Sequence, residues 1–310
     1  MNGQTGATAP APIRKEPRLL KWLIIPLVVV LIAIGAFLVW RSRSISVTYA
    51  RYGASYTSKP DFAQVEYLYP LSPKQLMSIT PQSLKKLDQE QVDQIYARLT
   101  AGPIPDGAYD GDLFFPKGAS GQKRLGEIVG GLKGVAADLE LTKLTLLGEA
   151  LWKGKVFYRD QRVLRNRISD VNLFKDFFPD PADQQELQAA KEHPTPENQY
   201  FPAKLYCGQS LLDSRRESVI IDYAFTDELP GYRRIPDNLA GREGLIVRDE
   251  IRMVRPGFYL GRAYMGGTFI LNFTLYNKAV ADQGSSAFLN NVKLPEDCWV
   301  GYQRLAASNE

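Results

Sequence analysis

Leu245-Ile-Val-Arg-Asp-Glu-Ile-Arg-Met-Val-Arg-Pro-Gly-Phe-Tyr-Leu-Gly-Arg-Ala-Tyr-Met-Gly-Gly-Thr-Phe-Ile-Leu-Asn-Phe-Thr-Leu-Tyr276 is the stretch of sequence that decides the fold. Its apolar and aromatic residues are interrupted twice by turn dipeptides, Pro256-Gly257 and Gly266-Gly267. This spacing predicts three strands joined by hairpin turns. The predicted strands cover residues 246–253, 258–265 and 269–276, and together they form an antiparallel meander.

Five further strand candidates precede the meander, at residues 108–115, 155–159, 163–168, 203–207 and 218–225. About eight strands with a meandering end predict a closed or nearly closed antiparallel barrel, whose interior has room for side chains or one small ligand. Helices accompany them. Thr80-Pro81 begins an amphipathic helix over residues 81–99, residues 123–151 read as helical, and Asp180-Pro181 begins a short helix that ends near His193. The fold class is therefore mainly β (α+β), with the barrel-like domain at residues 80–310.

A hydrophobic segment near the N-terminus predicts a transmembrane helix. Residues 22–40 contain no charge and have a tryptophan at each end, and Lys21 and Arg41 flank them. At 1.5 Å per residue they cover roughly 28 Å, which matches the apolar thickness of a bilayer. We expect an uncleaved single-pass anchor, a flexible tail at residues 1–21 and a stalk with little regular structure at residues 41–79. A cleaved signal peptide is the alternative, but a small-residue cleavage site does not follow the apolar run.

The basic charge of the chain belongs to the flanks of this segment. The formal net charge is +4, yet six of the 38 Lys and Arg residues lie in the first 43 positions, where Glu16 is the only acid. The remaining chain has a net charge of −1, which argues against nucleic acid as a partner. The cluster of cations before the span favours an inner-membrane protein whose domain is periplasmic or otherwise extracytoplasmic.

The two cysteines, Cys207 and Cys298, are 91 positions apart and do not form a metal-binding spacing. Two buried thiols are the simpler interpretation. An oxidising compartment would permit a disulfide between them instead.

Residues that could carry catalysis are few. The single histidine, His193, lies in a charged segment and is expected at the surface. Motifs of the phosphate-binding, dinucleotide-binding and serine-nucleophile kinds are missing from the sequence. We therefore expect no catalytic residue, metal or cofactor.

Three charged residues, Asp222, Asp249 and Arg262, lie in strands that should be largely buried. Val247, Asp249, Ile251 and Met253 share one face of their strand, and the opposite face (Ile246, Arg248, Glu250, Arg252) reads as a solvated barrel exterior. Buried charges normally pair, so an internal ion-pair network is one interpretation. The other is the polar end of a ligand cavity. Its predicted ligand-binding residues are Asp222, Tyr223, Asp249, Arg252, Tyr259 and Arg262, with an arginine facing an acidic head group.

Four segments resemble the signature of bacterial GXWXG/DUF4334-type proteins. They are Gly107-Ala-Tyr-Asp-Gly111, Trp152-Lys-Gly-Lys-Val-Phe157, Leu205-Tyr-Cys-Gly208 and Ile220-Ile-Asp-Tyr223. Tyr109 stands where the signature has tryptophan, and the resemblance covers residues 107–265. It implies a calycin/lipocalin-like domain that binds a small molecule, and it implies no catalytic residue.

The leading hypothesis is a membrane-anchored, non-enzymatic β-barrel domain that binds a lipid-like or apolar small molecule at the membrane surface. Its partners would be the lipid bilayer, through residues 22–40, and that apolar ligand. A second hypothesis is an accessory subunit with a side-chain-filled barrel that docks on another membrane protein. A third is an enzyme that uses Asp222, Asp249 and tyrosines for acid–base chemistry.

Overall fold

The computed structural model describes residues 46–52, 60–118 and 151–302, together with Val30, Ile32 and Ile34. The chain divides into two units, Met1–Ser46 and Val47–Glu310. In the first unit Val30, Ile32 and Ile34 are helical and exposed. The rest of the predicted membrane helix lies outside the described residues. Within the described residues, no helix combines the length and the hydrophobicity needed to cross a membrane.

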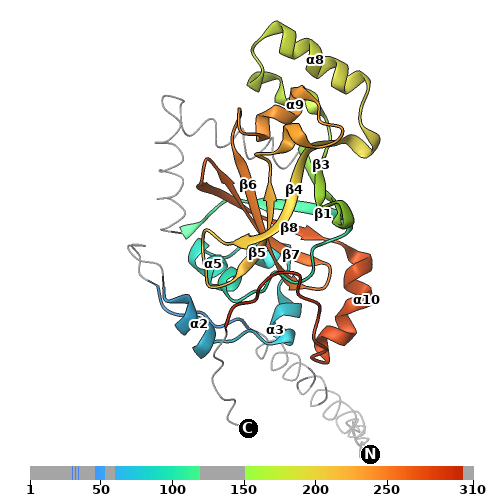
Figure 1. Ribbon diagram of the computed structural model, residues 1–310. Helices are drawn as coiled ribbons and strands as arrows, with labels where there is room; N and C mark the ends of the chain where they lie inside the picture. The colour runs from blue at the N-terminus through green and yellow to red at the C-terminus, as the bar shows by residue number, and fades with distance from the viewer. Residues whose placement is uncertain are drawn as a thin grey trace, which may run out of the picture. The chain divides into compact units, whose positions relative to one another are not determined.

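Eight antiparallel strands of the second unit close into a barrel in sequence order, and the last strand pairs with the first (Figure 1). The strands are β1 (Gly107–Phe114), β2 (Trp152–Tyr158), β3 (Val163–Ile168), β4 (Gln199–Gln209), β5 (Glu217–Asp222), β6 (Val247–Arg255), β7 (Phe258–Met265) and β8 (Thr268–Tyr276). The closed antiparallel barrel predicted from the sequence is confirmed.

Short helices cover the barrel. They are α2 (Phe62–Leu68), α3 (Pro73–Ser78), α4 (Pro81–Leu84), α5 (Gln89–Ala97), α8 (Pro181–Glu192), α9 (Arg234–Asp237) and α10 (Lys278–Leu289), with 3₁₀ turns η1 (Arg159–Gln161), η2 (Val171–Phe177), η3 (Pro196–Asn198), η4 (Thr226–Glu228) and η5 (Asn238–Ala240). The helix predicted after Asp180-Pro181 is confirmed as α8. The helical region predicted at 123–151 lies outside the described residues apart from Leu151.

The helix predicted at residues 81–99 is wrong in one respect, because it is interrupted. Asp88 has an extended backbone and begins α5, and the side chain of Gln91 accepts a hydrogen bond from the Asp88 amide at 3.1 Å. A capping residue followed three positions later by a glutamine is a capping box, which starts a new helix here rather than continuing the preceding one.

The predicted stalk also contains regular structure. α2 and α3 lie within it, and the side chains of their N-caps, Asp61 and Ser72, accept hydrogen bonds from amides of the first turn. Phe62 and Val65 are buried in an apolar cluster with α5 and the outer faces of β6 and β7. These capping and packing contacts explain why α2 and α3 form and why α2 packs onto the barrel.

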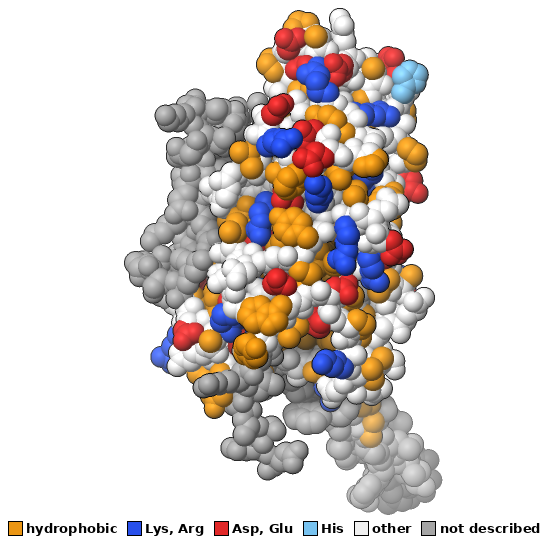
Figure 2. All heavy atoms as spheres, viewed as in Figure 1, with side chains coloured by type: hydrophobic (Ala, Val, Ile, Leu, Met, Phe, Trp, Pro, Cys, Tyr) orange, Lys and Arg blue, Asp and Glu red, His pale blue; other side chains and the backbone are white. Residues whose placement is uncertain are grey.

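The barrel wall separates two cores. Val247, Ile251 and Met253 point from β6 into the barrel, where they join the larger apolar cluster. Val254, with Phe258 and Leu260 of β7, points outward and is buried under α5. On the surface seen in Figure 2, basic and acidic side chains are intermixed, as the near-zero charge of this part of the sequence suggests.

Cys207 and Cys298 form a disulfide, with 5.3 Å between their Cα atoms. The interpretation as two free thiols is therefore wrong. The bond joins β4 to the segment that follows α10, and Glu217 donates its amide to the Trp299 carbonyl at 3.0 Å beside it. Neither contact could be inferred from a separation of 91 positions.

Candidate functional site

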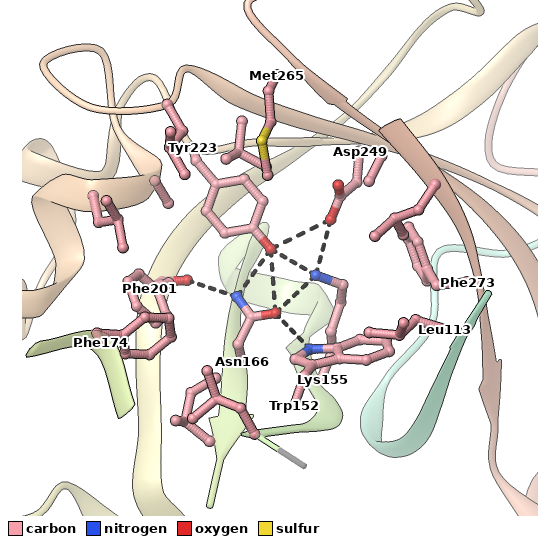
Figure 3. Close-up of a pocket in the computed structure, with 18 residues that line it drawn as sticks. Leu113, Trp152, Lys155, Asn166, Phe174, Phe201, Tyr223, Asp249, Met265 and Phe273 are labelled. Atoms are coloured by element: carbon pink, nitrogen blue, oxygen red, sulfur yellow. Dashed lines mark hydrogen bonds and ion pairs between the residues drawn. The ribbon is translucent and has the colours of Figure 1, made fainter. Parts of the chain in front are cut away.

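A cavity of about 240 Å³ lies inside the barrel, at the end where β6 begins and β7 finishes (Figure 3). Phe174 of η2 and Ala240 of η5 contribute to its wall. The lining is predominantly apolar and consists of Leu113, Leu151, Trp152, Lys155, Asn166, Ile168, Phe174, Phe201, Tyr223, Leu239, Ala240, Leu245, Val247, Asp249, Ala263, Met265, Leu271 and Phe273.

Aromatic rings pack together in the other half of the barrel interior. Tyr109 packs edge-on against Phe157 at 5.5 Å and against Tyr259 at 5.8 Å, between ring centroids. Such edge-to-face pairs contribute stability beyond the area they bury.

A polar cluster forms one wall of the cavity. The Lys155 ammonium lies 2.9 Å from Asp249 Oδ2 and donates to Asn166 Oδ1 at 2.8 Å and to the Tyr223 hydroxyl at 2.6 Å. These four residues are all buried, with residue exposures of 5% or less. Strand register brings them together, because Lys155 and Asn166 are direct partners across β2 and β3, and Asp249 is opposite Ile221, two residues before Tyr223.

Asn166 is at the centre of the cluster. Its Oδ1 also accepts from Trp152 Nε1 at 3.0 Å, and its Nδ2 donates to the Phe201 carbonyl at 3.2 Å and to the Tyr223 hydroxyl at 2.9 Å. An amide has two donor hydrogens and two acceptor positions, so every one of them is used. This saturation fixes the orientation of the Asn166 side chain.

The cluster keeps Lys155 charged and Tyr223 neutral. Burial by itself lowers the pKa of Lys155, but the Asp249 carboxylate and the Tyr223 hydroxyl outweigh it, so the net pKa lies above the usual value. Burial raises the pKa of Tyr223 to about 12, although the nearby Lys155 ammonium opposes this shift. The site thus holds one ion pair and a neutral phenol at pH 7.

Three aromatic rings surround the Lys155 ammonium. Its Nζ lies 5.5 Å from the ring centroid of Trp152, 5.3 Å from that of Tyr223 and 5.4 Å from that of Phe273. Cation–π attraction is strongest where the cation is desolvated. The rings therefore help to stabilise a charge that has been removed from water.

A β-bulge places Trp152 and Lys155 on the same face. In a regular strand residues three apart point to opposite faces. The pairing of β2 with β3 shifts register between Trp152 and Gly154, so both side chains line the cavity. Gly154 has φ +127°, and a Cβ there would lie 2.0 Å from the Tyr109 carbonyl oxygen, so only glycine fits.

Of the six predicted ligand-binding residues, the structure places Tyr223 and Asp249 in this cavity. Tyr259 also points into the barrel, but it packs against Tyr109 at the other end, where the Tyr259 hydroxyl donates to the Pro103 carbonyl at 2.6 Å. It borders a separate cavity of about 310 Å³ near α10.

Asp222 lies outside the cavity, and its predicted burial is wrong. β5 ends at this residue, and alternation turns its side chain outward, opposite to Ile221 and Tyr223. It is half-buried and accepts hydrogen bonds from the Tyr206 hydroxyl at 2.7 Å and the Ala224 amide at 2.9 Å.

Arg252 and Arg262 also point away from this cavity, and neither contributes to its wall. Arg262 contacts the Asp93 carboxylate of α5, and Arg252 donates to Ser218 Oγ at 2.9 Å and to the Tyr96 carbonyl at 3.2 Å. Both arginines are buried although they lie on the outer surface of the barrel. The prediction of a solvated barrel exterior is wrong at Glu250 and Arg252, because α5 covers both residues.

Sequence reasoning missed Lys155, Asn166 and Trp152. The predicted strand at 155–159 began at Lys155 without assigning that lysine a role. One feature of the sequence does indicate a partner of this kind, because Asp249 on an apolar inward face needs a buried cation. The sequence does not show which strand supplies that cation.

The structure also places the single histidine and a group of three possible metal ligands. His193 is exposed after α8, as predicted. Glu217 lies with Cys207 and Cys298 closely enough for a shared ion, but the two sulfurs are bonded to each other.

A comparison with known proteins found no matching family model, no matching curated protein and no matching solved structure. The resemblance to GXWXG/DUF4334-type proteins stays a prediction. Two of the segments that carry it contribute Trp152, Lys155 and Tyr223 to the cavity.

Proposed function

We propose that the chain is a membrane-anchored, non-enzymatic protein whose barrel binds one small, largely apolar molecule. The observation that supports this is the cavity of about 240 Å³, lined by apolar and aromatic side chains with one compact polar cluster. Ligand sites in proteins typically combine an apolar wall with a few well-placed polar groups. An eight-stranded barrel with a ligand-sized hollow in its interior is also the arrangement used by lipocalins, which supports the finer assignment of a calycin/lipocalin-like fold.

The cluster is better suited to binding than to catalysis. A lysine nucleophile must be deprotonated, whereas the raised pKa of Lys155 keeps it charged at pH 7. A tyrosine base would have to ionise, and the pKa of Tyr223 is raised to about 12. Joint acid–base chemistry by Asp222 and Asp249 is not supported either, because these carboxylates lie on opposite faces of the barrel wall.

Membrane attachment is proposed from the predicted helix at residues 22–40. The disulfide between Cys207 and Cys298 supports an extracytoplasmic domain, since such bonds persist in oxidising compartments.

Native mass spectrometry of the full chain, released from detergent, tests the proposal. The matched variants are Ala263→Phe, which fills the cavity, and Ala108→Phe, which makes the same change at an exposed position. We expect a small molecule to co-purify with the wild type and with Ala108→Phe but not with Ala263→Phe. A stoichiometric protein partner without any small molecule would instead support the accessory-subunit hypothesis and refute the proposed function.

A further inference from the structure

Asp249 has one carboxylate oxygen in use and one that is not. Its side chain is buried, with a residue exposure of 4%. Oδ2 lies 2.9 Å from Lys155 Nζ and accepts from the Tyr223 hydroxyl at 3.4 Å. Both contacts that Asp249 makes with described residues go to Oδ2 and none goes to Oδ1, and Figure 3 shows dashed lines to one oxygen of this carboxylate. Asp249 lines the cavity, so a ligand that covers Oδ1 without donating to it leaves this acceptor unsatisfied, at a cost in free energy.

The other polar side chains of the described cavity wall already use their hydrogen-bond donors and acceptors on one another or on the backbone. Lys155 has three donor hydrogens and three acceptors around it. The Tyr223 hydroxyl accepts from Lys155 and Asn166 and has Asp249 Oδ2 and Asn166 Oδ1 within reach of its own hydrogen. The Trp152 indole donates to Asn166. Asp249 Oδ1 is thus the one free polar side-chain atom of the described cavity wall, and it can only accept.

Charge restricts the ligand further. The Lys155–Asp249 pair is neutral overall, so an anion entering the cavity would meet the carboxylate without a free cation to balance it. A ligand cation would lie beside the Lys155 ammonium. Either charge would also lose its hydration, which costs several kcal/mol per ion. A neutral ligand avoids both penalties.

Volume sets the size of the ligand. An engineered cavity of about 150 Å³ binds benzene, which has six non-hydrogen atoms. By proportion, a cavity of about 240 Å³ takes roughly ten non-hydrogen atoms. A long acyl chain does not fit within this volume.

We propose that the ligand is a neutral alcohol or phenol of about ten non-hydrogen atoms, whose hydroxyl donates a hydrogen bond to Asp249 Oδ1. This inference rests on the proposed function and replaces the acidic head group expected from the sequence. The apolar walls surround the rest of the molecule, and the hydroxyl gives the site its selectivity. Molecules of the same size that lack a donor are excluded by the acceptor they leave unsatisfied.

Calorimetric titration of the full chain in lipid nanodiscs, with empty nanodiscs as the reference, tests the inference. The probes are 4-propylphenol, 1-fluoro-4-propylbenzene, which is nearly isosteric but cannot donate, and the anion 3-phenylpropanoate. A hydrogen bond to a charged acceptor contributes about 1.5–3 kcal/mol, so the phenol should bind about ten- to hundredfold more tightly than the fluoro compound. The anion should bind more weakly than the phenol.

Two variants distinguish a failure of the inference from a failure of the proposed function. Ala263→Phe should abolish phenol binding, while the double variant Lys155→Met/Asp249→Leu should keep the cavity but lose the preference for the phenol. Equal binding of phenol and fluoro compound to the wild type, abolished by Ala263→Phe, would overturn the inference and leave the proposed function standing. Binding of none of the three probes would refute the inference, and the mass spectrum of the wild type would then decide on the proposed function.

Discussion

The ion pair between Lys155 and Asp249 offers the sharpest test of the structure. Replacing Lys155 by methionine keeps the apolar stem but removes the ammonium. Asp249 is then left buried at 4% exposure with a charge that has lost its partner. Breaking a buried pair in this way typically costs about 3–5 kcal/mol.

The cost of protonating the orphaned carboxylate gives a similar estimate of the lost stability. The orphaned carboxylate can escape by taking up a proton, and protonating an ordinary aspartate at pH 7 costs about 4 kcal/mol. For a domain of this size class, 1 kcal/mol lowers the unfolding midpoint by about 2–4 °C, so Lys155→Met should lower it by roughly 8–16 °C. The loss should shrink as the pH is lowered towards 4, because a protonated Asp249 no longer needs a cation.

The assay is thermal unfolding of the full chain in one detergent, followed by near-UV circular dichroism. The double variant Lys155→Met/Asp249→Leu should recover most of the lost stability, since a buried pair can be replaced by apolar residues of similar volume at little cost. Lys278→Met is the matched control, because Lys278 forms an exposed pair with Asp282 at 2.5 Å and should show no measurable change. A Lys155→Met midpoint equal to that of this control would refute the reasoning.

Three further predictions concern other parts of the molecule. Arg262→Leu should lower stability by about 3–5 kcal/mol, because Asp93 of α5 loses its buried cationic partner. Phenol affinity, measured by calorimetry, should stay within twofold of wild type. Reducing the bond between Cys207 and Cys298 should cost about 2–4 kcal/mol in urea unfolding, and an unreduced chain that reacts with a thiol reagent would contradict the disulfide. Burial raises the pKa of Asp237 to about 6, above its usual 3.8, so ionisation of this residue disfavours the folded state. The wild type should therefore lose stability relative to Asp237→Ala as the pH rises from about 4 to 6. A pH-independent difference in unfolding free energy between the two would refute this.

The strands were predictable because their signals are local. β3 and β7 occupy the predicted residues 163–168 and 258–265. Alternation of apolar and polar residues and the intervening turn residues are both readable within a few positions. The first face of β6, with Asp249 among apolar residues, was likewise predicted and does point into the barrel.

The composition of the site could not be predicted because it depends on contacts between distant segments. Strict alternation assigns Trp152 and Lys155 to opposite faces, and only the bulge at Gly154 brings them together. Arg262 looked like a cavity residue because its strand is apolar, but the apolar partners on its face belong to α5. A periodic pattern shows that a face is buried and does not show what buries it.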